Sequence, residues 1–199
     1  MKKVETVILS AGLSSRMGED KALLHINGMT IIELIIKKLS GISSKVFVVL
    51  GGNYENVKKR VIVSEIYSDK IEFVYNEDHR LGMFSSIRKG IEQVSGRSFI
   101  LLQMIDQPFI EQSVYRKLIL NSDEHNLFFQ PFYKNRIGHP VLMSPKAKEL
   151  VLKYDNSASL KEVIEDHKIR RKLVPVDDNS VFQNINTKDE FRKMIKNQT

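Results

Sequence analysis

Residues 7–24 of the chain, VILSAGLSSRMGEDKALL, decide how the rest of the sequence is interpreted. An apolar run ends in Ser-Ala-Gly at residues 10–12, and two cations follow, Arg16 and Lys21. A buried strand that opens into a loop of small residues brings backbone N–H groups close to a ligand at the sheet edge. Arg16 offers a rigid fork of donors and Lys21 a mobile point charge, and both suit a polyphosphate. The segment therefore predicts a phosphate-binding loop after the first strand.

Two well-known phosphate loops do not match this segment. The pattern GxxxxGK[ST] fails because Gly18 is followed by Glu19. The pattern GxGxxG fails because Gly12 is followed by Leu13 and Ser14. On these residues alone, a polar surface loop with solvated cations is the alternative.

The same segment resembles the signature L-x-A-G-x-x-x-R-M-G-x-x-K of nucleotidyltransferases with the nucleotide-diphospho-sugar transferase fold. Within these enzymes it is most similar to the MobA-like group, especially the molybdenum cofactor cytidylyltransferases. The resemblance implies a loop that binds the triphosphate of an incoming nucleotide. The matching positions are Leu9, Ala11, Gly12, Arg16 and Lys21.

The composition is that of an ordinary globular protein. The 199 residues are enough for one substantial hydrophobic core, so we expect a single domain over residues 1–199. The absence of cysteine excludes disulfides, thiolate nucleophiles and cysteine-bound metals. The formal net charge of +7 favours anionic partners such as nucleotides. The basic runs are short and lack interleaved aromatic residues, so we interpret them as solvated helix faces and expect no nucleic-acid partner.

The start of the chain does not resemble a signal peptide. Met1, Lys2 and Lys3 lead into strand-like sequence that contains Glu5 and Thr6. No uncharged apolar run approaches the length of a membrane span. We therefore expect a cytoplasmic protein without a membrane partner.

Strand-like and helix-like segments alternate, which predicts an α/β protein with a largely parallel sheet. Expected strands span residues 4–9, 45–50, 71–75, 99–104, 127–132 and 172–176. Expected helices span residues 31–39, 83–94, 146–153 and 157–167. Two more helices are expected, one that Asn53 can cap and one that begins near Glu111. The apolar strand at 99–104 should be central, whereas Pro131 favours an edge position for its strand. The resemblance implies a three-layer α/β/α, Rossmann-like fold with a mostly parallel central sheet.

A second informative segment is NEDHRLGMFSSIRKG, residues 76–90. Ser85 and Ser86 fall in the first turn of the helix expected after Gly82, where free N–H groups and hydroxyls can meet an anion or a ribose. An ordinary glycine turn before a serine-rich helix start is the alternative. LGMFSSI is also similar to the G-M-x-x-S segment of the cytidylyltransferase group, which implies that Gly82, Ser85 and Ser86 approach the nucleotide.

Asp106 leaves the expected central strand within the sequence IDQP, residues 105–108. An aspartate at the carboxyl end of a buried strand, beside a phosphate loop, is well placed to hold Mg²⁺. The alternative is that Asp106 only caps the next helix. The segment resembles the G-D-Q-P motif of the family, in which the aspartate binds the catalytic metal, and here Ile105 replaces the usual small residue.

A short segment further along the chain resembles the part of the family's active site that binds the acceptor. Gly138, His139 and Pro140 resemble the G-H-P segment that shapes the acceptor side of the active site in the cytidylyltransferase group. We therefore assign these residues to substrate binding. A lone histidine is usually structural, and no partner spacing makes His139 a zinc ligand.

The sequence FQNINTKDEF, residues 182–191, departs from the family pattern. It resembles the closing D-I-D-T-P-E-D, whose first aspartate is commonly the second metal ligand, and Asn184 stands at that position. An asparagine carbonyl still coordinates Mg²⁺, but it removes negative charge and weakens the site. The alternative is a helix cap made by Thr187 and Glu190.

Together these resemblances imply a Mg²⁺-dependent nucleotidyltransferase. A phosphate oxygen of the acceptor attacks the α-phosphorus of a nucleoside triphosphate, and pyrophosphate leaves. Arg16, Lys21 and Asp106 are the expected catalytic residues, because each acts on charge that develops on phosphate oxygens. Asp106 and Asn184 are the expected metal ligands.

The resemblance favours CTP and a molybdopterin-type acceptor, with a client molybdoenzyme as a further partner. CTP is favoured because Ala11 stands where the guanylyltransferase branch tends to carry a second glycine. An N-x-N-T form, as at residues 184–187, also occurs in that branch, so guanylyl transfer is an alternative. Transfer to a sugar or polyol phosphate is another. A nucleotide or cofactor carrier that catalyses nothing is the alternative from a different class.

Overall fold

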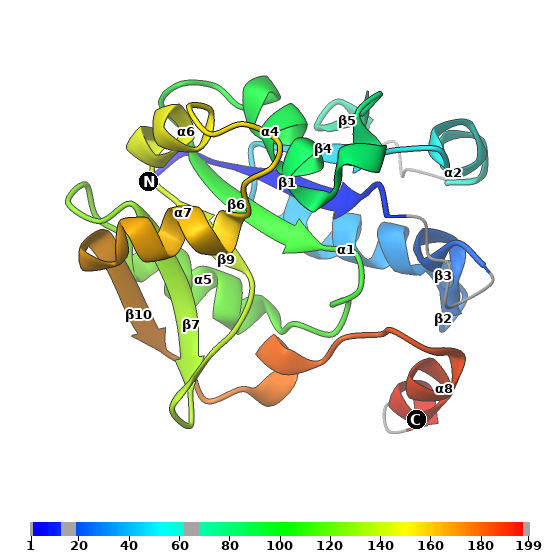
Figure 1. Cartoon of the computed structure of the whole chain (residues 1–199). Coiled ribbons are helices and arrows are strands. Elements are labelled where there is room, and N and C mark those ends of the chain that lie inside the picture. Colours follow the sequence, from blue (N-terminus) through cyan, green and yellow to red (C-terminus); the bar gives the residue numbers. More distant parts are fainter. Residues whose placement is uncertain (1, 13–18, 62–67, 197–199) are drawn as a thin grey trace.

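The computed structural model describes residues 2–12, 19–61 and 68–196. Its main sheet runs in the order β10-β7-β9-β6-β1-β4-β5, with β8 paired to β7 (Figure 1). The strands of this sheet are β1 (Val4–Ser10), β4 (Lys45–Leu50), β5 (Ile71–Tyr75), β6 (Phe99–Met104), β7 (Phe128–Tyr133), β8 (Arg136–Ile137), β9 (Val141–Met143) and β10 (Arg171–Pro175). A separate hairpin joins β2 (His25–Ile26) to β3 (Met29–Thr30).

The sheet is mostly parallel, as predicted. β1 pairs in parallel with both β4 and β6, and β4 with β5. β9 runs antiparallel to β6 and β7, while β10 is parallel to β7. β6 lies between β1 and β9, so its predicted central position is confirmed. Because β1, β4 and β6 run the same way, their carboxyl ends deliver loops to one edge of the sheet.

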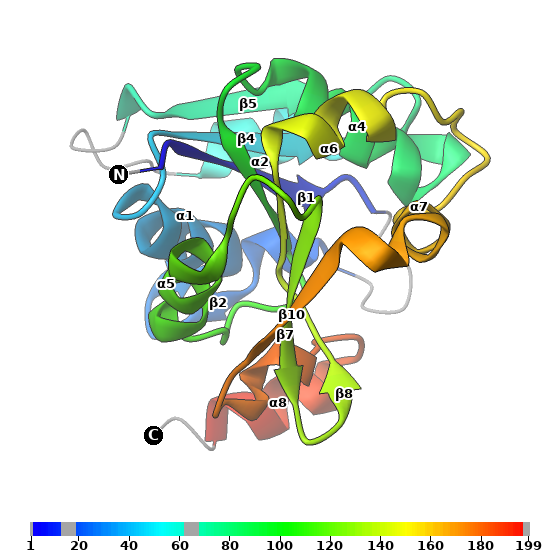
Figure 2. The same ribbon diagram turned by 90° about the vertical axis from the view of Figure 1, so that its left-hand side faces the viewer.

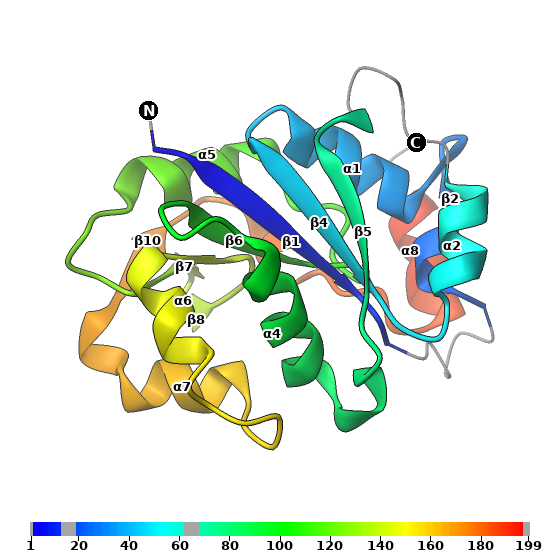
Figure 3. The same ribbon diagram turned by 90° about the horizontal axis from the view of Figure 1, so that it is seen from above.

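Helices cover both faces of the sheet, which confirms the three-layer architecture (Figure 3). One face carries α1 (Ile31–Ser40) and α5 (Gln112–Asn121), and the other carries α4 (Met83–Gln93), α6 (Pro145–Val151) and α7 (Leu160–Asp166). Alternation along β1 supplies both cores: Val7 packs with the α4 side and Ile8 with the α1 side. α2 (Tyr54–Arg60) and α8 (Lys188–Lys196) complete the α1 side, where Phe191 of α8 contacts the core.

The edge position predicted for the strand with Pro131 is wrong. β7 lies inside the sheet, with β10 on one side and β9 and β8 on the other (Figure 2). β9 pairs with Phe128 and Phe129, whereas β8 pairs with Phe132 and Tyr133. Pro131 falls between these two sets of pairs, so the hydrogen bond that proline cannot donate is not needed there.

In the described residues, no helix is both long and apolar enough to cross a membrane. The main sheet is continuous from β10 to β5. That the whole chain forms a single domain stays a prediction.

Candidate active site

A first pocket of about 710 Å³ opens at the carboxyl ends of β1 and β6. Residues far apart in the sequence meet there, and the predicted site residues among them are Leu9, Ala11, Gly12, Lys21, Gly82, Ser86 and Asp106. Arg16 lies outside the described residues. The roles assigned to these side chains stay predictions, but the fold places them around one cavity large enough for a nucleotide.

Lys21 is held at this pocket by a small network that the sequence did not reveal. Asp20 caps the one-turn helix of residues Lys21–Leu23, accepting from the Ala22 N–H at 3.1 Å. The Asn53 amide donates to the other Asp20 oxygen at 2.8 Å and to the Ser10 carbonyl at 3.1 Å. Lys21 Nζ in turn lies 3.5 Å from Asn186 Oδ1. The start of the chain and the segment before α8 therefore meet at this cation.

Asn53 was expected to cap α2, and it does occupy the N-cap position of this helix. Its amide, however, makes no capping bond. Its oxygen instead accepts from the Gly51 N–H at 3.1 Å, while its nitrogen bridges β1 and Asp20. Asn53 thus fixes the loop after β4 against the predicted phosphate loop.

The serines at the start of α4 have different surroundings. Asn76 Nδ2 donates to Ser85 Oγ at 3.0 Å and to Ser86 Oγ at 2.9 Å. Ser85 also donates to the carbonyls of Asp78 and Gly82, so its hydroxyl holds the turn before α4. Ser86 lines the first pocket. Gly82 has a φ of 108°, a conformation that favours glycine, and it begins α4.

Asp106 is the carboxylate of the first pocket. One of its oxygens, Oδ1, is buried and has no hydrogen-bond partner among the described residues. Burial raises the pKa of Asp106, and the positive charges of Lys21 and His139 oppose this rise. A buried carboxylate whose Oδ1 has no hydrogen-bond partner is expected to bind a positive group.

The turn that carries Asp106 is held from below by buried side chains. Tyr115 of α5 donates to Gln103 Oε1 at 2.8 Å, and Gln103 Nε2 donates to the Gln107 carbonyl at 3.0 Å. Lys38 of α1 donates to the carbonyls of Pro108 at 2.7 Å and Ile110 at 3.1 Å. The pKa of Lys38 is lowered, because the effect of burial exceeds the opposing effect of the negative charges of Glu111 and Asp178.

The segment before α8 closes onto the same turn. Gln107 Nε2 donates to Asn184 Oδ1 at 2.6 Å, and the Ile185 N–H donates to the Asp106 carbonyl at 2.8 Å. Thr187 and Glu190 form the expected reciprocal cap of α8, with the Glu190 N–H donating to Thr187 Oγ1 and the Thr187 N–H to Glu190 Oε2. Asn184 is therefore held against the turn that carries Asp106, but Asn186 and not Asn184 lines the first pocket. Metal binding by Asn184 stays a prediction.

The donor set fits a hard cation that is bound largely by its substrate. Asp106 supplies an unpaired carboxylate oxygen. Asn184 Oδ1 accepts one hydrogen bond and keeps a second lone pair. The described residues contain no group of three histidine, cysteine or acidic side chains that could hold a metal. Mg²⁺ commonly binds through one or two carboxylates together with substrate phosphates, and this site matches that pattern.

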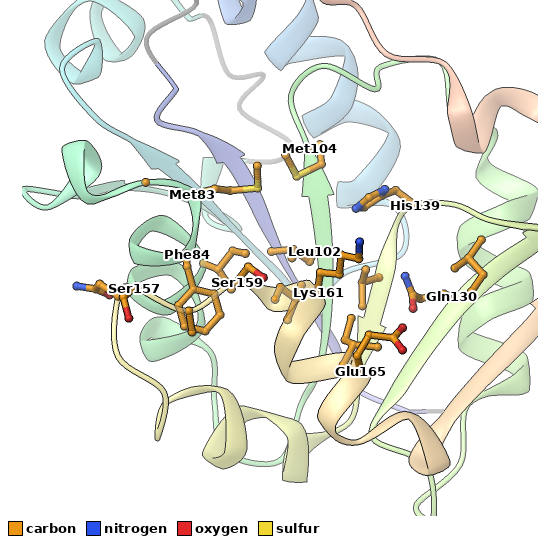
Figure 4. A pocket seen from close by; sticks show the side chains of 18 of the residues that line it. Met83, Phe84, Leu102, Met104, Gln130, His139, Ser157, Ser159, Lys161 and Glu165 are labelled. Carbon is orange, nitrogen blue, oxygen red and sulfur yellow. The ribbon is translucent and has the colours of Figure 1, made fainter.

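A second pocket of about 590 Å³ adjoins the first, and Gly82, Met83 and Met104 line both. Its walls are mainly apolar and include Phe84 and Leu102. Figure 4 shows Gln130, Lys161 and Glu165 on one side of the pocket, with Phe84 across from them and His139 near Met104. The second pocket therefore has largely apolar walls, with Gln130, Lys161 and Glu165 grouped on one side and Ser157 near Phe84 on the other.

The predicted substrate segment borders this second pocket. His139 lines this pocket. The pKa of His139 is lowered, because the effect of burial exceeds the opposing effect of the Asp106 charge. The Gly138 N–H donates to the Pro131 carbonyl at 2.9 Å, and a Cβ on Gly138 would lie 2.8 Å from Val181. Glycine is thus required for the close approach that places His139. Pro140 follows through a cis peptide bond and leads into β9.

Sequence reasoning missed the polar residues of the second pocket. Gln130 interrupts the aromatic run LFFQPF, and a polar residue inside an apolar strand was a usable signal. The helical pattern around Lys161 and Glu165 predicts only a solvated face, because charged residues on a helix are usually exposed. Only the packing of α7 against β7 and β9 brings them to the cavity.

The fold and the first pocket are typical of α/β proteins that bind a ligand at the carboxyl ends of parallel strands. The model of the MobA-like NTP transferase domain matches residues 6–172, and the chain belongs to this family of nucleotidyltransferases. The resemblance inferred from the sequence is confirmed.

Relatives of the chain span nearly its full length. It is 25% identical over 194 residues to the molybdenum cofactor cytidylyltransferase of Escherichia coli K12, covering 96% of this chain and 95% of that protein. It is 24% identical over 205 aligned residues to a probable molybdenum cofactor guanylyltransferase of Bacillus cytotoxicus, covering 98% of each. Cytidylyl- and guanylyltransferases are therefore about equally similar to it.

Solved structures share the fold. The crystal structure of Rv0371c from Mycobacterium tuberculosis matches with a TM-score of 0.82 and 19% identity, over 98% of this chain and 99% of that one. A structure of the same protein in complex with manganese matches with a TM-score of 0.79 and 20% identity, over 98% and 99%.

Proposed function

We propose that this protein transfers a nucleoside monophosphate from CTP to a molybdopterin-type acceptor and releases pyrophosphate. The observation that carries the proposal is the meeting of Lys21 and the buried, unpaired carboxylate of Asp106 in the first pocket, with the second pocket directly beside it. Two adjoining cavities with charge at their junction suit a reaction that joins two bound substrates.

The chemistry requires alignment and charge stabilisation. An oxygen of the acceptor phosphate forms a bond to the α-phosphorus, and the bond from that phosphorus to the oxygen that bridges it to the β-phosphate breaks. Lys21 stabilises the negative charge on the departing pyrophosphate, and Arg16 is proposed to do the same. Asp106 and Asn184 would hold Mg²⁺, which neutralises phosphate oxygens when bound. Ser86 and the backbone near Ala11 orient the nucleotide.

The preference for one nucleotide over another rests on fewer residues than the proposed reaction does. Ala11 supports CTP, because the guanylyltransferase branch tends to carry a glycine at that position. Asn184 and Asn186 support GTP, because the N-x-N-T form occurs in that branch. The relatives of the two kinds are about equally similar. Ala11 and Asn186 both line the first pocket, so the proposal of CTP rests on the resemblance of the motifs to the cytidylyltransferase group.

The test is pyrophosphate release by the purified protein with Mg²⁺, each ribonucleoside triphosphate in turn, and molybdopterin as acceptor. Release with CTP that is abolished in Asp106→Ala is the expected result. Release with GTP alone would move the protein to guanylyl transfer. Nucleotide binding without release would point to sugar or polyol phosphates as acceptors, which are tested next. Failure with those as well would identify a carrier.

A further inference from the structure

Gln130 is a buried amide of the second pocket that lacks a hydrogen-bond partner. It lies in the interior of β7 with 8% of its surface exposed, and its neighbours Phe129 and Pro131 project to the opposite face. Its Oε1 has no partner among the described residues, and no hydrogen bond from its Nε2 is seen there either. Buried polar groups are nearly always paired, so an unpaired amide that lines a cavity points to a ligand.

Glu165 adds a carboxylate to the same side of the pocket. Its Oε1 accepts from Arg171 at 2.6 Å, so β10 fixes the position of this side chain and leaves Oε2 for another donor. Glu165 follows Lys161 by one helical turn on α7, and Figure 4 shows both with Gln130 along one wall. Half of the Glu165 side chain is exposed, so the carboxylate is available from the cavity.

These groups form a specific pattern of donors and acceptors. The Gln130 amide offers one donor and one acceptor side by side, and Glu165 offers a further acceptor. The complementary ligand edge has a carbonyl, a ring N–H and an amino group in succession. A 2-amino-4-oxo pyrimidine ring, as found in pterins and guanine, carries this edge, whereas sugar and polyol phosphates do not. Phe84 and Leu102 provide apolar walls for the faces of such a ring.

We propose that Gln130 and Glu165 determine acceptor specificity by hydrogen bonding to the 2-amino-4-oxo edge of a fused heterocycle. This inference rests on the proposed function, because it takes the second pocket as the acceptor site. A ring bound at Gln130 directs the rest of the acceptor toward Met104, which also lines the first pocket. The acceptor phosphate then reaches the side of Asp106.

The test compares two probes that differ in the amino group. 6-Hydroxymethylpterin has the full edge, and 6-hydroxymethyllumazine carries an oxygen in place of the 2-amino group. Binding is measured by ligand fluorescence with the full-length protein and three variants, Gln130→Leu, Glu165→Gln and the control Glu149→Gln. Glu149 is exposed on α6 and is not part of either pocket.

The wild type and Glu149→Gln should bind the pterin about 10-fold or more tightly than the lumazine. Glu165→Gln should lose this preference, and Gln130→Leu should weaken both probes about 10-fold. Gln130→Leu should not lower the melting temperature, because it removes a buried amide without a partner. A merely structural role for Gln130 predicts the opposite, with lower stability and unchanged probe binding.

Unchanged pterin binding in both variants, or no pterin binding by the wild type, would overturn the inference. Guanosine 5′-monophosphate is the third probe, since it carries the same edge, and tighter binding of this nucleotide than of the pterin would also overturn it. Pyrophosphate release is measured in parallel. Pyrophosphate release with CTP and molybdopterin, together with probe binding that does not depend on Gln130 or Glu165, would overturn this inference and leave the proposed function standing. If the probes bind as predicted but no pyrophosphate is released with any acceptor, the proposed function is wrong and the inference about probe binding stands.

Discussion

The two adjoining pockets are built in different ways. The first takes its polar groups from loops at strand ends, with Lys21 after β1 and Asp106 after β6. The second takes its groups from the elements themselves, with Gln130 on β7 and Glu165 on α7. Loops can bring charge and backbone N–H groups close to phosphates, whereas strand and helix faces form a shaped, largely apolar cavity. We infer that the residues of the first pocket accelerate the transfer step, whereas those of the second pocket select the acceptor.

The largest expected effect comes from removing the charge of Asp106. Asp106→Asn should reduce turnover about 1,000-fold, because it removes a charge that acts in the transition state. Nucleotide binding in the absence of metal should change little. Pyrophosphate release and equilibrium binding check the two parts, with Asp177→Asn as the control because its side chain is 99% exposed. Turnover within tenfold of wild type would refute the role of Asp106.

Lys21→Ala should have the next largest effect, about 100-fold on turnover. The lysine is proposed to stabilise the departing pyrophosphate, and its loss should also weaken triphosphate binding. Binding of a pterin probe in the second pocket should not change. The control is Lys153→Ala, an exposed lysine of the α6–α7 connection. A loss of pterin binding in Lys21→Ala would contradict the division of labour between the pockets.

Tyr115→Phe tests the support beneath Asp106. The change leaves Gln103 Oε1 without its donor in a buried site, which should cost about 1–3 kcal/mol of unfolding free energy. Turnover should fall more than pterin affinity, because this network holds the turn of Asp106, which lines the first pocket and not the second. Denaturant unfolding measures the stability, with Tyr75→Phe on the half-exposed end of β5 as the control. Equal stabilities of the two variants would contradict the prediction.

The pH dependence of stability follows from the raised pKa of Asp106. Because the folded pKa lies above the unfolded one, the ionised form is disfavoured in the folded state at pH values above both. This cost disappears as the pH falls through the raised folded pKa. In EDTA, Asp106→Asn should therefore melt at a higher temperature than the wild type at pH 8. The difference should shrink in acid, and a difference that grows in acid would refute the prediction.

The smallest effect concerns the helix that carries Glu165. Ser159 caps α7 by accepting from the Glu162 N–H, and Ser159→Ala should cost about 1 kcal/mol. Thr30→Ala removes the equivalent cap of α1 and should cost a similar amount. Only Ser159→Ala should raise the KM for the acceptor. Equal acceptor KM values in the two variants would show that α7 does not shape the second pocket.

The sequence predicted the first pocket better than the second for a physical reason. The residues of the first pocket follow buried strands directly, and parallel strands bring their carboxyl ends to one edge. Asp106 could therefore be placed near the predicted phosphate loop from the order of strands along the chain, whereas Gly82 and Ser86 were added to the same site by the resemblance to the family motifs. The N-cap position of Asn53 was predicted, but the partners of its side chain were not, because a helix cap and a bridge between loops use the same amide.

By itself, the sequence determined the alternation of strands and helices, the central position of β6 and the family. These follow from local apolar patterns and from motifs that are contiguous in the chain. Only the tertiary structure decided that β7 lies inside the sheet and that Gln130 and Glu165 share a cavity. Strand order and the facing of α7 depend on contacts between segments distant in the chain, and no local pattern encodes them.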